Sequence, residues 1–194
     1  MNKLEIADLY SLEEYARQRA EFRARVIEHK RHRRLHLGDH LTLCFEDRLT
    51  MQYQVQEMLR TERIFEEEGI RGELEAYNPL IPDGSNWKAT LLIEFPDPAE
   101  RSRQLARLVG VEHRVWVQVD GRPPVTAIAD EDLERSTESK TSSVHFLRFE
   151  LVPDMVAALK EGATLRAGVD HPACTVRIDA VPEVVRESLV ADLE

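Results

Sequence analysis

Residues 33–45 read RRLHLGDHLTLCF, and this stretch decides between an all-helical and a mixed fold. Its apolar residues recur at every second position, whereas those before it recur at helical spacing. If the Gly-Asp-His tripeptide forms a hairpin loop, Leu37 pairs with Leu41 and Leu35 with Leu43 on one face. We therefore predict a small β-hairpin here rather than a continued helix.

Helices are predicted on both sides of this hairpin. Residues 8–33 have apolar side chains at helical spacing, an N-cap candidate in Asp8, and no internal Gly or Pro. Residues 47–68 have apolar side chains on two opposite arcs, which predicts a helix with neighbours on both sides. Residues 69–77 continue as a short helix, and the Pro-, Gly- and Asn-rich residues 77–86 form a connection.

Beyond residue 87 the pattern changes mostly to strands. Short β-rich runs occupy residues 88–95, 113–119, 125–129, 144–152, 164–169 and 175–181. Helices that open with a proline are predicted for residues 98–109, 153–161 and 182–193. Tight links between neighbouring strands, such as Asp120-Gly121, favour antiparallel pairing.

The fold class that follows is α+β. We predict one domain spanning residues 1–194, in which an N-terminal helical hairpin packs on an antiparallel β-sheet with covering helices. Residues 8–77 are expected to be mainly helical, and residues 88–194 mainly sheet with helices. The linker is too short, and the helical part too poor in apolar residues, for two independent domains.

Composition places the chain among soluble globular proteins. It has 194 residues, of which 42% are hydrophobic and 32% charged. No apolar run approaches the roughly 20 residues that span a bilayer, and the N-terminus does not have the pattern of a secretory signal. Cys44 and Cys174 give neither zinc-ligand spacing nor a disulfide framework. We expect a cytoplasmic protein.

Positive charge is concentrated in one stretch of an acidic chain. Residues 17–36 carry eight Arg or Lys and two Glu, a net charge of +6, so the remainder carries −16 and the whole chain −10. The two regions could compensate each other within the fold or across a homodimer, or the basic stretch could form an anion site. The overall charge and the aromatic content of 6% argue against nucleic acid and membrane surfaces as partners.

The common catalytic and nucleotide-binding motifs are absent from the sequence. It contains no Gly-x-Gly-x-x-Gly, no Walker loop, no Gly-x-Ser-x-Gly and no His-Glu-x-x-His. An unfamiliar site must therefore be sought in the arrangement of charged side chains.

The two N-terminal helices offer one candidate site. Helical phase places Arg19, Arg23 and Lys30 on the apolar arc of the first helix, so these cations should point toward the protein. Polar residues of the second helix face them: Glu57, Arg60 and Glu62. One interpretation is an ion-pair network that joins the helices. The other is a pocket in which Arg19, Arg23, Arg60 and Glu62 bind a carboxylate or phosphate and Glu57 acts as a catalytic base.

Metal binding is not predicted. His29, His32, His36 and His40 have helical ligand spacing, but the predicted hairpin separates them. Glu57 and Glu62, alone or with Glu14 and Glu21 of the first helix, could form a carboxylate site. The first two lie about 140° apart around a straight helix and cannot share one ion. We predict no stoichiometric metal and no cofactor.

A polar segment follows the acidic stretch at residues 130–138. Residues 140–143 read KTSS and are predicted to form a mobile polar loop. The loop is either simply solvated or able to close over a bound anion.

Four segments resemble an uncharacterised bacterial family, domain-of-unknown-function family 3501. They are TMQYQVQEMLRTERI at residues 50–64, the following residues 73–82, VHFLRF at residues 144–149 and VDHP at residues 169–172. The resemblance spans nearly the whole chain and implies no established activity or catalytic residue. Genes of the family often lie near those of rubrerythrin-like and iron–sulfur oxidoreductase proteins, which implies a redox setting. The chain's two cysteines cannot hold a four-cysteine cluster.

Two functions remain open at this stage. The first is a non-enzymatic cytoplasmic accessory protein that binds a protein partner, such as a rubrerythrin-like or iron–sulfur protein, through the basic residues 17–34. The alternative is a small-molecule enzyme that uses the Arg/Glu site between the two N-terminal helices.

Overall fold

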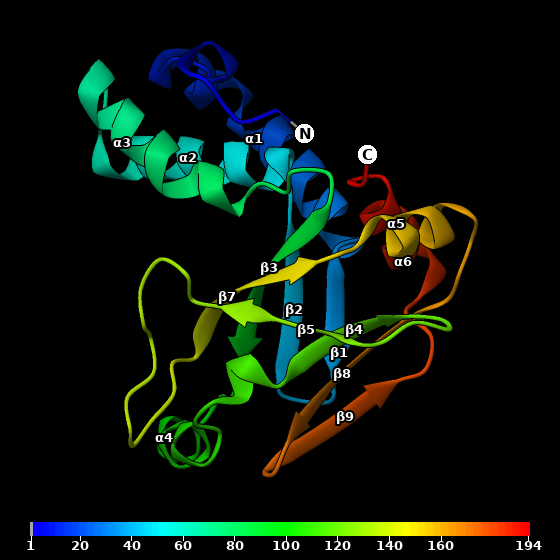
Figure 1. Ribbon diagram of the computed structural model, residues 1–194. Helices are drawn as coiled ribbons and strands as arrows, with labels where there is room; N and C mark the ends of the chain where they lie inside the picture. Colours follow the sequence, from blue (N-terminus) through cyan, green and yellow to red (C-terminus); the bar gives the residue numbers. More distant parts are fainter. Residues whose placement is uncertain (1) are drawn as a thin grey trace.

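The computed structural model describes residues 2–194 and shows two antiparallel sheets with helices at their ends (Figure 1). The N-terminal helices are η1 (Ile6–Asp8), α1 (Leu12–Arg31), α2 (Arg48–Glu62), α3 (Glu67–Tyr77) and η2 (Asn78–Leu80). In Figure 1, α1, α2 and α3 lie together at one end of the five-stranded sheet. The α+β class is confirmed.

Local hydrogen bonds explain where the N-terminal helices differ from the prediction. Helix α1 begins at residue 12 rather than 8 because the Ser11 side chain accepts from the Glu14 backbone N–H, and the Glu14 side chain accepts from that of Ser11. The predicted helix over residues 47–68 is two helices, because Arg63 adopts a left-handed backbone conformation with φ of 57°. Helix α3 then starts in a new direction.

The predicted hairpin is confirmed in its register. Strand β1 (Arg34–Leu37) pairs with β2 (Leu41–Glu46), so that Leu35 lies opposite Leu43 and Leu37 opposite Leu41. Gly38 supplies the positive φ of 74° that the turn requires. The change from helical to twofold periodicity therefore marks the true boundary between helix and sheet.

The strands belong to two sheets rather than the single sheet we predicted. The first sheet has the order β1-β2-β3-β7-β6, with β3 (Asn86–Ile93), β7 (Val144–Glu150) and β6 (Ile128–Ala129). The second has the order β5-β4-β8-β9, with β5 (Val125–Thr126), β4 (Val115–Val119), β8 (Leu165–His171) and β9 (Cys174–Ile178). The predicted strand over residues 125–129 is divided between them.

The crossing point between the two sheets is Ala127. Its backbone N–H donates to the Val115 carbonyl in the second sheet at 2.9 Å. Three residues later the Asp130 N–H donates to the Phe146 carbonyl in the first sheet at 2.8 Å. A continuous β-rich sequence can thus serve two sheets in turn.

The main core lies between the facing sheets. Trp87 and Phe149 of the first sheet, and Leu165 and Ala167 of the second, are fully buried in one apolar cluster. Helices α5 (Pro153–Lys160) and α6 (Glu183–Val190) cover one end, where the Trp87 indole N–H donates to a carbonyl of α6. The remaining elements, α4 (Pro98–Arg107) and η3 (Val111–His113), connect β3 to β4.

Arg33 fastens the N-terminal helices to the sheets. This fully buried guanidinium forms an ion pair with Asp192 and donates to the carbonyls of Phe45 and Glu46 and to Ser188 of α6. A buried cation of this kind is tolerated only when its donors are satisfied.

Among residues 2–194, no helix has the length and apolar character needed to cross a membrane.

Candidate functional site

The predicted pairing of α1 with α2 forms between Arg19 and Glu57. Nε and Nη2 of Arg19 donate to Oε1 and Oε2 of Glu57, both at 2.7 Å, and the Tyr15 hydroxyl donates to Oε1 at 2.5 Å. The hydrogen bond from Arg19 lowers the pKa of Glu57, burial opposes this, and the Tyr15 hydroxyl lowers it further. The Glu57 carboxylate is thus held by intramolecular donors.

The other residues of the predicted anion site do not converge on this pair. Lys30 is half-buried, with its ammonium 5.9 Å from the centre of the Tyr53 ring, as the helical phase predicted. Arg23 is exposed, so the prediction that it points toward the protein is wrong. Arg60 and Glu62 are exposed near the end of α2, and the charge of Arg60 contributes to lowering the pKa of Glu57.

The four clustered histidines do not come together. His29 lies 2.5 Å from Asp47, His36 lies 3.1 Å from Thr42, and His40 contacts the Glu94 carbonyl at 3.1 Å. His32 is exposed at the end of α1. The hairpin separates the four side chains as the sequence predicted.

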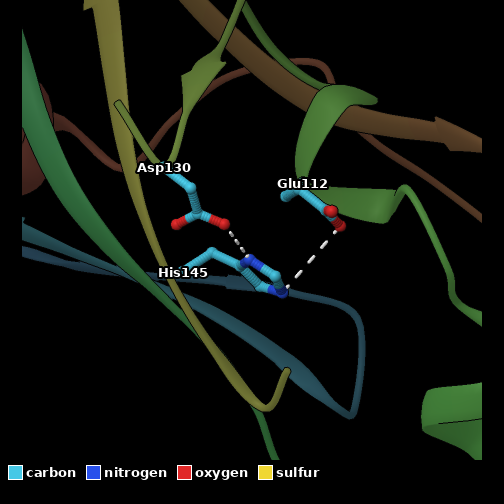
Figure 2. A group of neighbouring side chains, drawn as sticks. All are labelled: Glu112, Asp130 and His145. Atoms are coloured by element: carbon cyan, nitrogen blue, oxygen red, sulfur yellow. Dashed lines mark hydrogen bonds and ion pairs between the residues drawn. The ribbon is translucent and has the colours of Figure 1, made fainter. Parts of the chain in front are cut away.

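A different group of ionisable side chains converges where the sequence analysis placed no site. Glu112 comes from η3, Asp130 follows β6, and His145 lies on β7, with its side chain between the two carboxylates (Figure 2). His145 faces the core because every second residue of β7 points to the same side, and His145 shares that side with the buried Leu147 and Phe149. All three side chains are nearly or fully buried.

Both ring nitrogens of His145 have close partners. Nδ1 lies 2.6 Å from Oδ2 of Asp130. Nε2 lies 2.8 Å from the Thr141 hydroxyl, 3.1 Å from the Ser142 carbonyl and 3.8 Å from Oε2 of Glu112. The Ser142 carbonyl and the Asp130 carboxylate are both hydrogen-bond acceptors, so each ring nitrogen has an acceptor beside it. The contacts therefore place the imidazole between two carboxylates.

Hydroxyl groups complete the surroundings of Glu112. Ser136 donates to Oε1 at 2.5 Å, and Thr141 donates to Oε2 at 3.2 Å. Burial by itself raises the pKa of Glu112, but the Ser136 hydroxyl, the residue's own backbone N–H and the charge of His145 together lower it. Glu112 is thus stabilised as a carboxylate.

Asp130 is held in a strained but well-bonded position. Its φ of 49° lies in the left-handed region, which an aspartate tolerates better than most residues. Its Oδ1 accepts from the Phe146 backbone N–H at 3.0 Å and from Arg135 at 3.2 Å. The guanidinium of Arg135 lies 4.5 Å from the centre of the Phe146 ring. Arg135 and His145 therefore both contact the carboxylate of Asp130, one at each oxygen.

The ligand atoms of Glu112, Asp130 and His145 lie within 4.8 Å of one another, a spacing that could hold a metal ion. The two ring nitrogens face different carboxylates, so no single nitrogen of His145 points at both acids. The absence of stoichiometric metal stays a prediction. The arrangement fixes residues 130–142 to β7. We call this group the clamp; it consists of Glu112, Asp130, Ser136, Thr141 and His145.

The clamp changes the interpretation of the KTSS segment. Thr141 is buried, with 1% of its surface exposed, although the whole of residues 140–143 was predicted to be a mobile polar loop. The sequence contained one usable signal. A histidine at an inward position of an alternating strand must find polar partners, and the nearby loop is rich in hydroxyls and carboxylates.

Comparison with known proteins places the chain in a family. The model of the family described as "Protein of unknown function (DUF3501)" matches residues 3–193. The chain belongs to the DUF3501 family. This DUF3501 chain is similar to a novel protein of unknown function from Burkholderia pseudomallei whose crystal structure is known. The two sequences are 52% identical, the match covers 100% of each chain, and the structures superpose with a TM-score of 0.95. A search of curated proteins gave no match.

Proposed function

We propose that this DUF3501 chain is a non-enzymatic accessory protein of the bacterial cytoplasm that binds an acidic protein surface through α1. The observation that supports the proposal is a line of side chains along this helix. Arg19, Arg23, Ile27 and Lys30 follow one another at intervals of four, four and three residues, which places them on one stripe. We call this the α1 stripe.

Two residues of the α1 stripe are available for a partner. Arg23 is exposed, and within residues 2–194 its side chain makes no hydrogen bond or ion pair. Ile27 is 42% exposed although it is apolar. Arginine beside an exposed aliphatic side chain is typical of protein–protein contacts. A nucleic acid is a less suitable partner, because its phosphate backbone gains nothing from contact with an isoleucine and is repelled by the acidic remainder of the chain.

The partner we propose is a redox protein, such as a rubrerythrin-like or iron–sulfur protein, on the strength of the family's setting. An acidic surface on that partner would complement the α1 stripe, and charge pairing of this kind speeds association and depends on salt. The enzyme alternative receives less support, since Arg19 already directs two donors at Glu57 rather than at a ligand.

The test is binding to purified rubrerythrin-like and iron–sulfur proteins at stepped salt concentrations. We expect binding that weakens with salt and falls roughly tenfold or more in Arg23→Glu. Arg114→Glu is the matched control, because Arg114 is also exposed and its side chain has no bonding partner within residues 2–194. Capture that salt does not weaken, no capture, or an equal loss in both variants would contradict the proposal.

A further inference from the structure

A cavity of about 600 Å³ lies between the α3–η2 segment and the outer face of the first sheet, the face turned away from the second sheet. Tyr77, Pro79 and Leu80 form one wall. Phe146 and Lys88 lie on the sheet, where each alternates with inward-facing core residues. The volume is in the range of small-molecule sites, and the lining combines apolar side chains with charged ones, two basic and three acidic.

Lys88 is the unpaired cation of this cavity. It is half-buried on β3, and its ammonium makes no hydrogen bond or ion pair with any of residues 2–194. Burial lowers the pKa of Lys88, and Arg148 beside it lowers it further, whereas Glu131 acts in the opposite direction. An ammonium in such a place gains by meeting an anion.

Two carboxylates near Lys88 already have other partners. Glu46 lies opposite Lys88 across the sheet, but its oxygens accept from Thr50 at 2.7 Å and from Thr90 at 2.8 Å. Glu131 accepts two hydrogen bonds from Arg148, both at 2.8 Å. The structure thus keeps Lys88 free although acidic residues are close.

From this arrangement we propose that the cavity binds a small monocarboxylate with an aromatic or aliphatic body, whose carboxylate pairs with Lys88. One free cation matches one negative charge, and the lining carboxylates of Glu75, Glu131 and Asp132 repel a dianion such as phosphate about twice as strongly as a monoanion. Tyr77 and Phe146 provide apolar surface for the body of the ligand. The site is separate from the α1 stripe and does not depend on it.

The clamp positions one wall of this cavity. Asp130 is fixed by His145, and the next residue, Glu131, holds Arg148 against the sheet. The cavity is therefore bounded by two elements that are each anchored, α3 through its apolar contacts with α2 and the loop through the clamp. A preformed site of this kind loses little entropy when it binds a ligand.

The test is calorimetric titration of the full chain with benzoate and hexanoate, with benzamide and inorganic phosphate as comparison probes. We expect saturable binding of at least one carboxylate, with benzamide and phosphate roughly tenfold weaker or undetected. Lys88→Met should weaken carboxylate binding roughly tenfold or more, and Lys88→Arg should retain it. Lys160→Met, at an exposed lysine of α5, is the matched control.

A second variant keeps the test decisive if Lys88→Met fails to fold. Ala76→Trp places a large side chain in the cavity from the exposed surface of α3, so it should abolish binding without changing a charge. The proposal is overturned if neither carboxylate binds, if phosphate binds as tightly as benzoate, or if folded Lys88→Met or Ala76→Trp binds like the wild type.

Discussion

Glu57 shows what a single ion pair contributes in this protein. Its carboxylate accepts from Arg19 and Tyr15, and these donors hold its pKa below the ordinary value of 4.5. The folded state therefore favours ionised Glu57 more than the unfolded chain does. Stability from this source is present above pH 4.5 and is lost as the pH falls through the lower pKa of the folded protein.

We expect acid to reduce the free energy of unfolding less steeply in Glu57→Gln than in the wild type. Below pH 4.5 the unfolded wild-type chain takes up a proton at Glu57 before the folded chain does, and glutamine cannot. Urea unfolding from about pH 3 to about pH 6, the range in which carboxylates titrate, measures this difference in the pH dependence of the free energy of unfolding. Glu62→Gln, at an exposed position of the same helix, should follow the wild type; matching slopes in all three proteins would contradict this.

At the scale of elements, the clamp joins the loop over residues 130–142 to β7. We expect His145→Leu to lower the free energy of unfolding by about 3 kcal/mol, because it leaves two buried carboxylates facing each other without the imidazole. Hydrogen exchange should also accelerate at the backbone of residues 131–141.

His32→Leu is the control for this variant, since His32 is an exposed histidine at the end of α1, outside the clamp. A change at His32 should leave the free energy of unfolding within about 0.5 kcal/mol of the wild type. If His145→Leu is equally mild, the clamp does not stabilise the loop.

The sequence predicted those elements whose signals are local. The hairpin register follows from alternating leucines around a Gly-Asp-His turn, and the Arg19–Glu57 pair follows from helical phase. The division of residues 125–129 between two sheets has no local signal. The clamp was missed for the same reason, because Glu112, Asp130 and His145 come from three separate elements that only the tertiary fold brings together.

At the scale of the whole molecule, the N-terminal helices depend on the C-terminal part. Arg33 is buried against Asp192 and Ser188, more than 150 residues away in the chain. Without these partners its guanidinium would keep Asp47, 3.5 Å away, but would lose the ion pair with Asp192 and the bonds to Ser188. The apolar clusters that α1, α2 and α3 form among themselves are small compared with the core between the sheets.

We therefore expect a fragment of residues 1–83 to lack a stable fold. Circular dichroism during heating should show no cooperative transition for the fragment, while the full chain melts sharply. A cooperative melt of the fragment would mean that the helical part is an independent domain, contrary to the single unit we propose.

The crossing at Ala127 joins the two sheets directly. Ala127 bonds to Val115 of the second sheet, and the next residue, Ile128, already pairs with Arg148 of the first. Consecutive Cα atoms are only about 3.8 Å apart, so the two sheets must lie close together at this point. They therefore cannot part or slide here without first breaking the backbone hydrogen bond of Ala127 or the pairing of β6 with β7.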